Sequence, residues 1–229
     1  MKRPTANGLA FVVLVLAPPA HAQISGGVTL ATDYRVRGVS LTDRRGVVAA
    51  HAAYDHASGV YAGGEVVAHD PASEGVRVLG HQAYAGVAGR FAGGADWDVG
   101  VSHVDMTPYF DRRYSLEYIQ AHVGLARGDL SGRLSIASGY PRKGVETAYL
   151  ELNGVVRPAD AWRLTGHVGV QARLSQRRGD DERLDLTLGV VRSFGNVEAQ
   201  LSWTVLTPRP EPHVSWTRPG VTAAVSVYF

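Results

Sequence analysis

The chain has 229 residues and no cysteine, and its formal net charge of +2 comes from 23 lysines and arginines against 21 acidic residues. Disulfides are therefore excluded as a source of stability, and no apolar run reaches the roughly 20 residues that a membrane-spanning helix needs. Lys2 and Arg3 account for the whole positive excess. The remainder is neutral and lacks the net positive charge typical of proteins that bind nucleic acids.

The first 22 residues have the pattern of a secretory signal peptide. A basic start precedes the apolar run from Leu9 to Ala17, and Ala20-His21-Ala22 fits the small-x-small cleavage pattern. We expect cleavage near Ala22, before Gln23, and export of the mature chain into the periplasm. Residues 23–229 are then long enough for one domain.

Beyond the signal peptide, apolar and polar residues alternate with a period of two, which predicts strands with one apolar face. No stretch has the periodicity of a helix. Twelve strands are expected, over residues 27–38, 47–55, 60–68, 76–88, 95–104, 114–126, 130–138, 145–156, 162–173, 184–190, 197–205 and 219–229. Because a misplaced boundary could merge or split a pair of weakly patterned strands, ten strands remain an alternative.

The last strand has the strictest alternation. From Val221 through Val225 to Phe229, every second residue is apolar and lies on one face of the strand. The polar residues between them lie on the other face. An exposed terminal Phe is unusual for a soluble domain, where chain ends are polar and frayed. The stretch resembles the closing strand of bacterial outer-membrane barrels, and the last strand of a soluble sandwich is the alternative.

The connections between strands alternate in length. Short ones lie at residues 57–58, 90–94, 127–129, 157–161 and 195–196, and longer, more polar ones at 39–45, 69–75, 105–112, 139–144, 175–182 and 207–218. Such sorting is expected when one barrel end carries tight periplasmic turns and the other carries extracellular loops. The sequence therefore predicts an all-β fold, a transmembrane antiparallel up-and-down β-barrel with both termini on the short-turn side.

One segment carries a family motif. Residues 32–43, Thr-Asp-Tyr-Arg-Val-Arg-Gly-Val-Ser-Leu-Thr-Asp, resemble the opening motif of the TorF-type porin family, which is close to S-D-Y-x-F-R-G-x-S-Q-T/S-D. Residues 54–63 are similar to the family's Y-x-H-x-S-G-F-Y-A-G stretch. Val36, Leu41 and Val60 depart from the pattern, which has Phe, Gln and Phe there. The resemblance implies a bacterial outer-membrane barrel and specifies no solute.

Charged residues on the polar faces are expected to point into the barrel, since an arginine facing the membrane centre costs about 2–4 kcal/mol. Asp33, Arg35 and Arg37 are expected on one face of the first strand, with Arg37 near the outer mouth. Two interpretations stay open: a paired ladder that closes the lumen, or a constriction ring that selects small anions or zwitterions. The lumen or constriction candidates are Asp33, Arg35, Arg37, Glu65, Asp98, Glu117, Glu151, Arg163, His167, Asp185 and Glu198.

Catalytic and metal-binding motifs are missing from the sequence. There is no H-x-x-x-H, H-E-x-x-H or G-x-S-x-G arrangement and no glycine-rich phosphate loop, so we expect neither an enzyme nor a cofactor or metal. A barrel-borne lipid hydrolase is an alternative, with Ser102 or Ser202 beside His103 or His167. Adjacent Ser102 and His103 would point to opposite faces of a strand and could not pair.

These patterns together predict a porin of the bacterial outer membrane that lets small polar solutes pass by diffusion. Its expected partners are membrane lipid, lipopolysaccharide and the solutes, and not nucleic acid. The rival interpretation is a non-conducting barrel that acts as a structural protein or adhesin through its six outer loops. The oligomeric state is left open.

Overall fold

The computed structural model describes residues 23–69, 75–108, 115–174, 182–207 and 217–229. No helix in these ranges is long and apolar enough to cross a bilayer. The predicted signal peptide lies outside the described residues. The strands are β1 Gln23–Ala31, β2 Arg35–Val36, β3 Val39–Ser40, β4 Val47–Asp55, β5 Val60–His69, β6 Arg77–Arg90, β7 Asp96–Met106, β8 Leu116–Arg127, β9 Leu130–Ser138, β10 Glu146–Ala159, β11 Trp162–Arg173, β12 Arg183–Phe194, β13 Val197–Thr207 and β14 Gly220–Tyr228.

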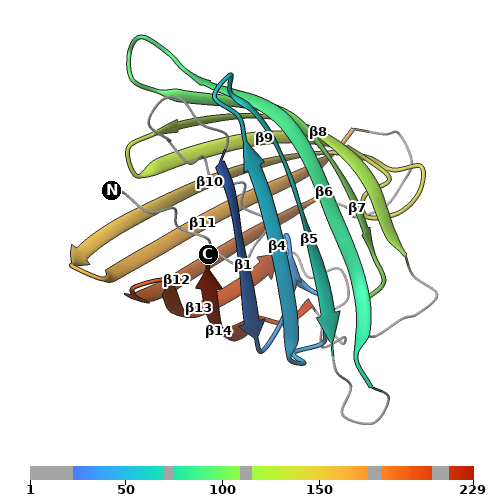
Figure 1. Ribbon diagram of the computed structural model, residues 1–229. Coiled ribbons are helices and arrows are strands. Elements are labelled where there is room, and N and C mark those ends of the chain that lie inside the picture. Colours follow the sequence, from blue (N-terminus) through green and yellow to red (C-terminus); the bar gives the residue numbers. More distant parts are fainter. Residues whose placement is uncertain (1–22, 70–74, 109–114, 175–181, 208–216) are drawn as a thin grey trace.

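Twelve of these strands form one closed barrel. Each pairs antiparallel with its neighbours in the order β1-β14-β13-β12-β11-β10-β9-β8-β7-β6-β5-β4, and β4 pairs with β1 to close the ring. The first and last strands lie side by side (Figure 1), and the backbones of Gly26 and Phe229 exchange two hydrogen bonds of 3.0 Å. The predicted fold, a transmembrane antiparallel barrel of about twelve strands, is confirmed.

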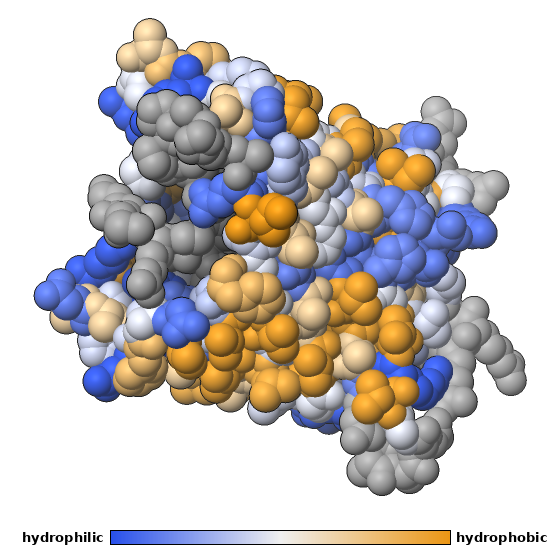
Figure 2. Space-filling view, in the orientation of Figure 1, coloured by the Kyte–Doolittle hydropathy of each residue, from blue (hydrophilic) through white to orange (hydrophobic). Residues whose placement is uncertain are grey.

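The barrel wall is apolar outside and polar inside. On β11, for example, Leu164 and Val168 are exposed whereas His167 and Gln171 are buried. Figure 2 shows hydrophobic side chains gathered on the outer wall over β1, β4 and β14. Large exposed aliphatic side chains destabilise a protein in water but match the hydrocarbon of a bilayer, so the alternation sorts one face to lipid and one to the lumen.

The two barrel ends differ. Tight turns close one end, which we call the short-turn end, and the longer connections lie at the opposite, loop end. At the turn between β4 and β5, Gly59 has a φ of +89° and its amide donates to the carbonyl of His56 at 2.9 Å. A Cβ at this glycine would collide with the backbone oxygen of Ala88, so the turn requires glycine.

The first strand is shorter than predicted. It ends at Ala31, and residues 32–46 form a loop inside the barrel, which we call the inner hairpin, with β2 and β3 at its centre. Arg37 and Gly38 connect β2 to β3 with φ values of +47° and +79°. Two positive φ values define the tight turn that suits the twist of a two-stranded hairpin.

The inner hairpin packs into an apolar core within the loop end of the barrel. Val67, Met106 and Leu206, which lie at or near the loop-end termini of their strands, are at most 1% exposed. The core comprises Tyr34, Val39, Leu41, Val47, Ala49, Val67, Leu79, Val104, Met106, Leu116, Tyr118, Ala137, Tyr140 and Leu206. Towards the short-turn end some inward side chains, such as Asp98 and Glu198, are buried, and others are half-exposed, among them Tyr84, Asn153, Thr165, Gln200 and Ser226. The lumen is therefore packed with apolar side chains at the loop end and lined by polar side chains, some of them half-exposed, towards the short-turn end.

Candidate functional site

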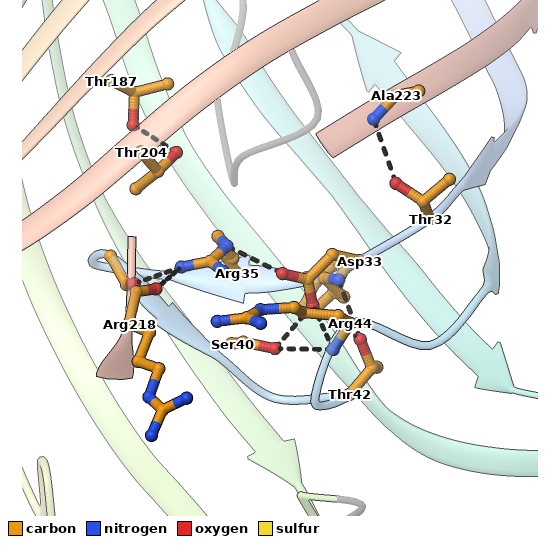
Figure 3. Close-up of polar contacts among 12 residues, drawn as sticks. Thr32, Asp33, Arg35, Ser40, Thr42, Arg44, Thr187, Thr204, Arg218 and Ala223 are labelled. Atoms are coloured by element: carbon orange, nitrogen blue, oxygen red, sulfur yellow. Dashed lines mark hydrogen bonds and ion pairs between the residues drawn. The ribbon is translucent and has the colours of Figure 1, made fainter. Parts of the chain in front are cut away.

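The carboxylate of Asp33 organises the inner hairpin. One oxygen accepts from Arg35 Nε at 2.7 Å, and the other accepts from the hydroxyls of Ser40 at 2.5 Å and Thr42 at 2.9 Å and from the backbone amide of Arg44 at 3.2 Å (Figure 3). The side chains of Arg35 and Asp33 are 5% and 1% exposed. A buried charge that accepts several hydrogen bonds fixes the local chain path, which explains why the strand stops at residue 31.

Three further hydrogen bonds hold the inner hairpin in place, and one of them lies within the hairpin. Arg35 Nη1 donates to the carbonyl oxygens of Gly38 at 3.0 Å and Arg218 at 3.3 Å. The Tyr34 hydroxyl donates to Glu65 of β5 at 2.7 Å. Burial, followed by the charge of Glu65, raises the pKa of the Tyr34 phenol well above its usual value, so this hydroxyl remains a donor.

The side chain of Arg37 reaches wall residues of β8, β10 and β11 and Tyr140 of the loop between β9 and β10. Its guanidinium carbon lies 4.2 Å from the ring centre of Tyr140, 4.4 Å from that of Tyr149 and 5.8 Å from that of Tyr118. Nη2 donates to the side-chain oxygen of Gln120 at 2.9 Å, and Nη1 to that of Gln171 at 3.3 Å. We call these three tyrosines and two glutamines the cation cage.

A buried polar cluster lies on the wall formed by β5 to β9. Asp98 Oδ2 lies 2.8 Å from His122 Nε2 and accepts from the Tyr61 hydroxyl at 3.2 Å and from Arg133 Nη2 at 3.3 Å. The hydroxyl of Tyr61 is also 3.2 Å from His122 Nε2. One carboxylate thus joins side chains from four strands.

A second cluster of similar composition lies on β10 to β12. The Tyr149 hydroxyl donates to Asp185 Oδ2 at 3.0 Å and lies 3.1 Å from His167 Nε2, which is 3.0 Å from Asp185 Oδ1. The other ring nitrogen of His167 lies 2.7 Å from Asn153 Oδ1. Because Tyr149 also belongs to the cation cage, this cluster holds one face of the cage in place.

Glycines let these tyrosines lie flat against the wall. A Cβ at Gly100 would lie 2.6 Å from the Tyr61 hydroxyl, and one at Gly169 would collide with the Tyr149 hydroxyl. Inward-facing strand positions without a side chain accept the edge of a neighbouring ring. The many strand glycines therefore shape the lumen wall rather than weaken it.

At the short-turn end an ion pair joins two wall strands that are separated by one other strand. Arg163 Nη2 of β11 donates to Glu198 of β13 at 2.6 Å, and Ser193 between them donates to the same carboxylate at 3.0 Å. Both charged side chains are about one-tenth exposed, at 11% and 10%. The pair is therefore nearly buried.

The structure places most of the predicted lumen residues inside the barrel. Glu65, Asp98, Glu151, Arg163, His167, Asp185 and Glu198 occupy inward positions of their strands. Their role in solute passage stays a prediction. Arg37 lies inside the barrel as well, but in the inner hairpin and not on a wall strand.

Two placements were wrong. Asp33, Arg35 and Arg37 do not share a face of a spanning strand, because the capture of Asp33 by its own loop ends β1 before them. Glu117 does not face the lumen: it shares the outward parity of exposed Ile119 on β8 and lies 3.5 Å from Lys143 at the loop end. Beyond the apolar part of the wall, an outward charge costs little.

Several site residues were missed. Arg133 and Gln171 are on inward faces that the sequence pattern marks as polar, so the parity alone could have found them. Tyr61, Tyr118 and Tyr149 were missed because aromatic residues of a barrel are ordinarily assigned to its membrane interfaces. Their inward parity was the available signal.

No metal centre is assembled among the described residues. No group of three or more histidine and acidic side chains in the described ranges could hold a metal ion. Ser102 Oγ is buried without a hydrogen-bond partner, and Ser102 faces inward while His103 faces outward. The alternative serine and histidine pairing is therefore not formed by Ser102 and His103.

The fold is that of solved outer-membrane porins. The structure described as "NanC porin structure in rhombohedral crystal form" superposes with a TM-score of 0.57, covering 90% of this chain and 99% of that chain at 8% identity. The "KdgM porin in complex with disordered oligogalacturonate" gives a TM-score of 0.53, covering 91% and 98% at 11% identity. Identities this low show a shared fold and nothing of the solute.

No curated protein sequence matches the chain. The model of a family described as "Bacterial protein of unknown function (Gcw_chp)" matches residues 17–207. The narrower resemblance to TorF-type porins stays a prediction. Since the match spans most of the chain, this protein belongs to the Gcw_chp family of bacterial proteins.

Proposed function

We propose that the chain is a channel of the bacterial outer membrane through which small polar solutes pass by diffusion, with the inner hairpin as its narrowest part. The proposal includes export with signal-peptide cleavage near Ala22, short turns in the periplasm and loops outside. The observation that supports it best is the wall itself, which is aliphatic outside and charged inside, as in Asp98, Glu151 and Arg163.

The composition of the lumen favours small solutes that carry both charges or a positive charge. Acidic side chains of Asp98, Glu151 and Asp185 face the lumen, and arginines 37 and 133 lie among them. The oligogalacturonate bound by the KdgM porin is an acidic chain. A wall of mixed sign repels such a polyanion more than it repels a zwitterion.

The packed loop end favours the second candidate, a non-conducting barrel that acts through its outer loops. Leu206 and Met106 are almost fully buried in the core that the inner hairpin joins. Conduction therefore requires that the hairpin moves or leaves a narrow path beside it. An adhesin or structural barrel needs no such path. The two candidates differ in one measurable property, conductance.

The test is single-channel recording in planar bilayers with the wild type and a barrel that lacks the inner hairpin. Ala31 and Val47 are direct ladder partners, so Asn-Gly can replace residues 32–46 as a two-residue turn between them. We expect small or infrequent openings from the wild type and large steady ones from the shortened barrel. If both proteins are folded and silent, the channel proposal is wrong and the non-conducting barrel stands.

A further inference from the structure

We propose that the cation cage is a guanidinium-binding site, which Arg37 fills as an internal ligand while the inner hairpin occupies the lumen. A solute with a guanidinium group takes the place of Arg37 when the hairpin withdraws. This inference rests on the proposed channel function for its biological role, but the site itself does not depend on conduction.

Neutral groups hold the Arg37 cation. Two ring faces lie 4.2 and 4.4 Å from the guanidinium carbon, and the oxygens of Gln120 and Gln171 accept from its two terminal nitrogens. Within the described residues no carboxylate lies within ion-pair distance of Arg37. Glu151 interacts with Arg37 electrostatically but forms no ion pair with it. Since no carboxylate is directly paired with the bound cation, an equivalent free cation can replace it.

The geometry selects a planar cation. A guanidinium presents two flat faces to aromatic rings and several N–H donors in its plane. Tyr140 and Tyr149 meet the faces, while Gln120 and Gln171 lie where in-plane donors point. A tetramethylammonium ion has no N–H donors for these oxygens, and a spherical sodium ion has no flat face for the two rings, so both should bind less tightly.

The cage is held by contacts that do not include Arg37. Tyr149 is anchored to Asp185 and His167, and Tyr140 packs edge-on against Tyr118 with ring centres 5.0 Å apart. The site should therefore persist when the arginine side chain is removed, as a preorganised binding site does.

The turn chemistry provides a suitable variant. Arg37 has a φ of +47°, a conformation that Asn and Gly adopt more readily than Arg does. Arg37→Asn creates Asn-Gly, a favoured sequence for such a turn, and empties the cage without straining the hairpin. Arg37→Gly is the second variant, and Arg45→Ala removes an exposed arginine of the same loop as the matched control.

The experiment measures heat-induced unfolding of the purified barrel in detergent with guanidinium chloride at low millimolar concentration. We expect Arg37→Asn to unfold about 5 °C below the wild type and guanidinium to recover most of that shift. Equal concentrations of sodium chloride or tetramethylammonium chloride should recover little, and wild type and Arg45→Ala should not respond. Adding Tyr140→Leu to Arg37→Asn should abolish the recovery.

The inference is overturned if guanidinium acts on both folded Arg37 variants no more than sodium chloride does, or if recovery survives Tyr140→Leu. The readout is unfolding temperature and not current. A barrel that binds guanidinium but never conducts contradicts the channel proposal alone, whereas a conducting barrel that ignores guanidinium contradicts the cage alone.

Discussion

Arg133 of β9 lies opposite Glu151 of β10 in the sheet register, yet its guanidinium contacts Asp98 of β7, two strands away on the other side. Gly124 of β8 lies between the two partners and carries no side chain to block them. Glu151 is left without an ion pair in the part of the chain that the structure describes. The charge pattern of the lumen therefore depends on a glycine.

Gly124→Ala should break this arrangement. The new methyl group would collide with Asp98 Oδ1, and overpacking of this kind costs about 1–3 kcal/mol. Equilibrium unfolding in urea measures the loss of stability. Gly166→Ala is the matched control, because its methyl group would have no neighbour nearer than 4.0 Å; equal losses in both variants would contradict the account.

Asp33→Asn should release the inner hairpin while the barrel stays folded. The change removes one partner of a buried ion pair with Arg35, which costs about 3–5 kcal/mol when the other charge stays buried. The hairpin can relieve this cost by leaving the lumen. Conductance should then rise towards that of the barrel in which Asn-Gly replaces residues 32–46.

Asp129→Asn provides the control for Asp33→Asn. Asp129 pairs with Arg157 at the short-turn end, where both side chains are about half exposed, and surface pairs contribute little. It should leave conductance unchanged. A similar rise in both variants would show that the barrel, and not the hairpin, had been loosened.

Glu151→Gln and Glu117→Gln should differ in their effect on ion selectivity. Glu151 faces the lumen and Glu117 the outside, so only the first contributes to the field along the path of an ion. In the hairpin-shortened barrel, we expect Glu151→Gln to shift the reversal potential under a salt gradient towards anion preference. An equal shift from Glu117→Gln would contradict the assigned faces.

Val168→Arg tests the lipid-facing wall. Val168 is an exposed residue near the middle of β11, and an arginine on this face near the membrane centre costs about 2–4 kcal/mol. Thr165→Arg places the same charge on the lumen side of the same strand and should cost much less. Folding and urea unfolding in lipid vesicles measure both, and equal costs would argue against a bilayer-spanning barrel.

The barrel wall was predictable from sequence because lipid imposes a period of two on every strand. The strand expected over 197–205, for example, is Val197–Thr207 in the structure. The inner hairpin was not predictable in this way. Alternation through Tyr34 and Val36 fits a hairpin as well as a long strand, since both have the same period. What decides between them is the capture of Asp33 by Ser40 and Thr42.

Site contacts depend on register, which the sequence pattern does not fix. The polar parity of Arg133 could be recognised from its own strand. Its partner Asp98 could not, because their contact needs Gly124 to fall between them when three strands align. The cation cage likewise combines residues from three wall strands, β8, β10 and β11, with Tyr140 from the loop between β9 and β10.

The seam between β1 and β14 has a consequence for how the chain reaches its native state. Its partners are far apart in the sequence, as in the hydroxyl contact between Thr29 and Ser226. Until that seam forms, every partly assembled sheet carries two unpaired edges, which invite association with other chains. Forming the seam carries the largest loop-closure entropy cost in the molecule, and the hydrogen bonds that offset this cost form only at the final step. To avoid aggregation, the chain therefore needs those strand edges to be shielded until the barrel has closed.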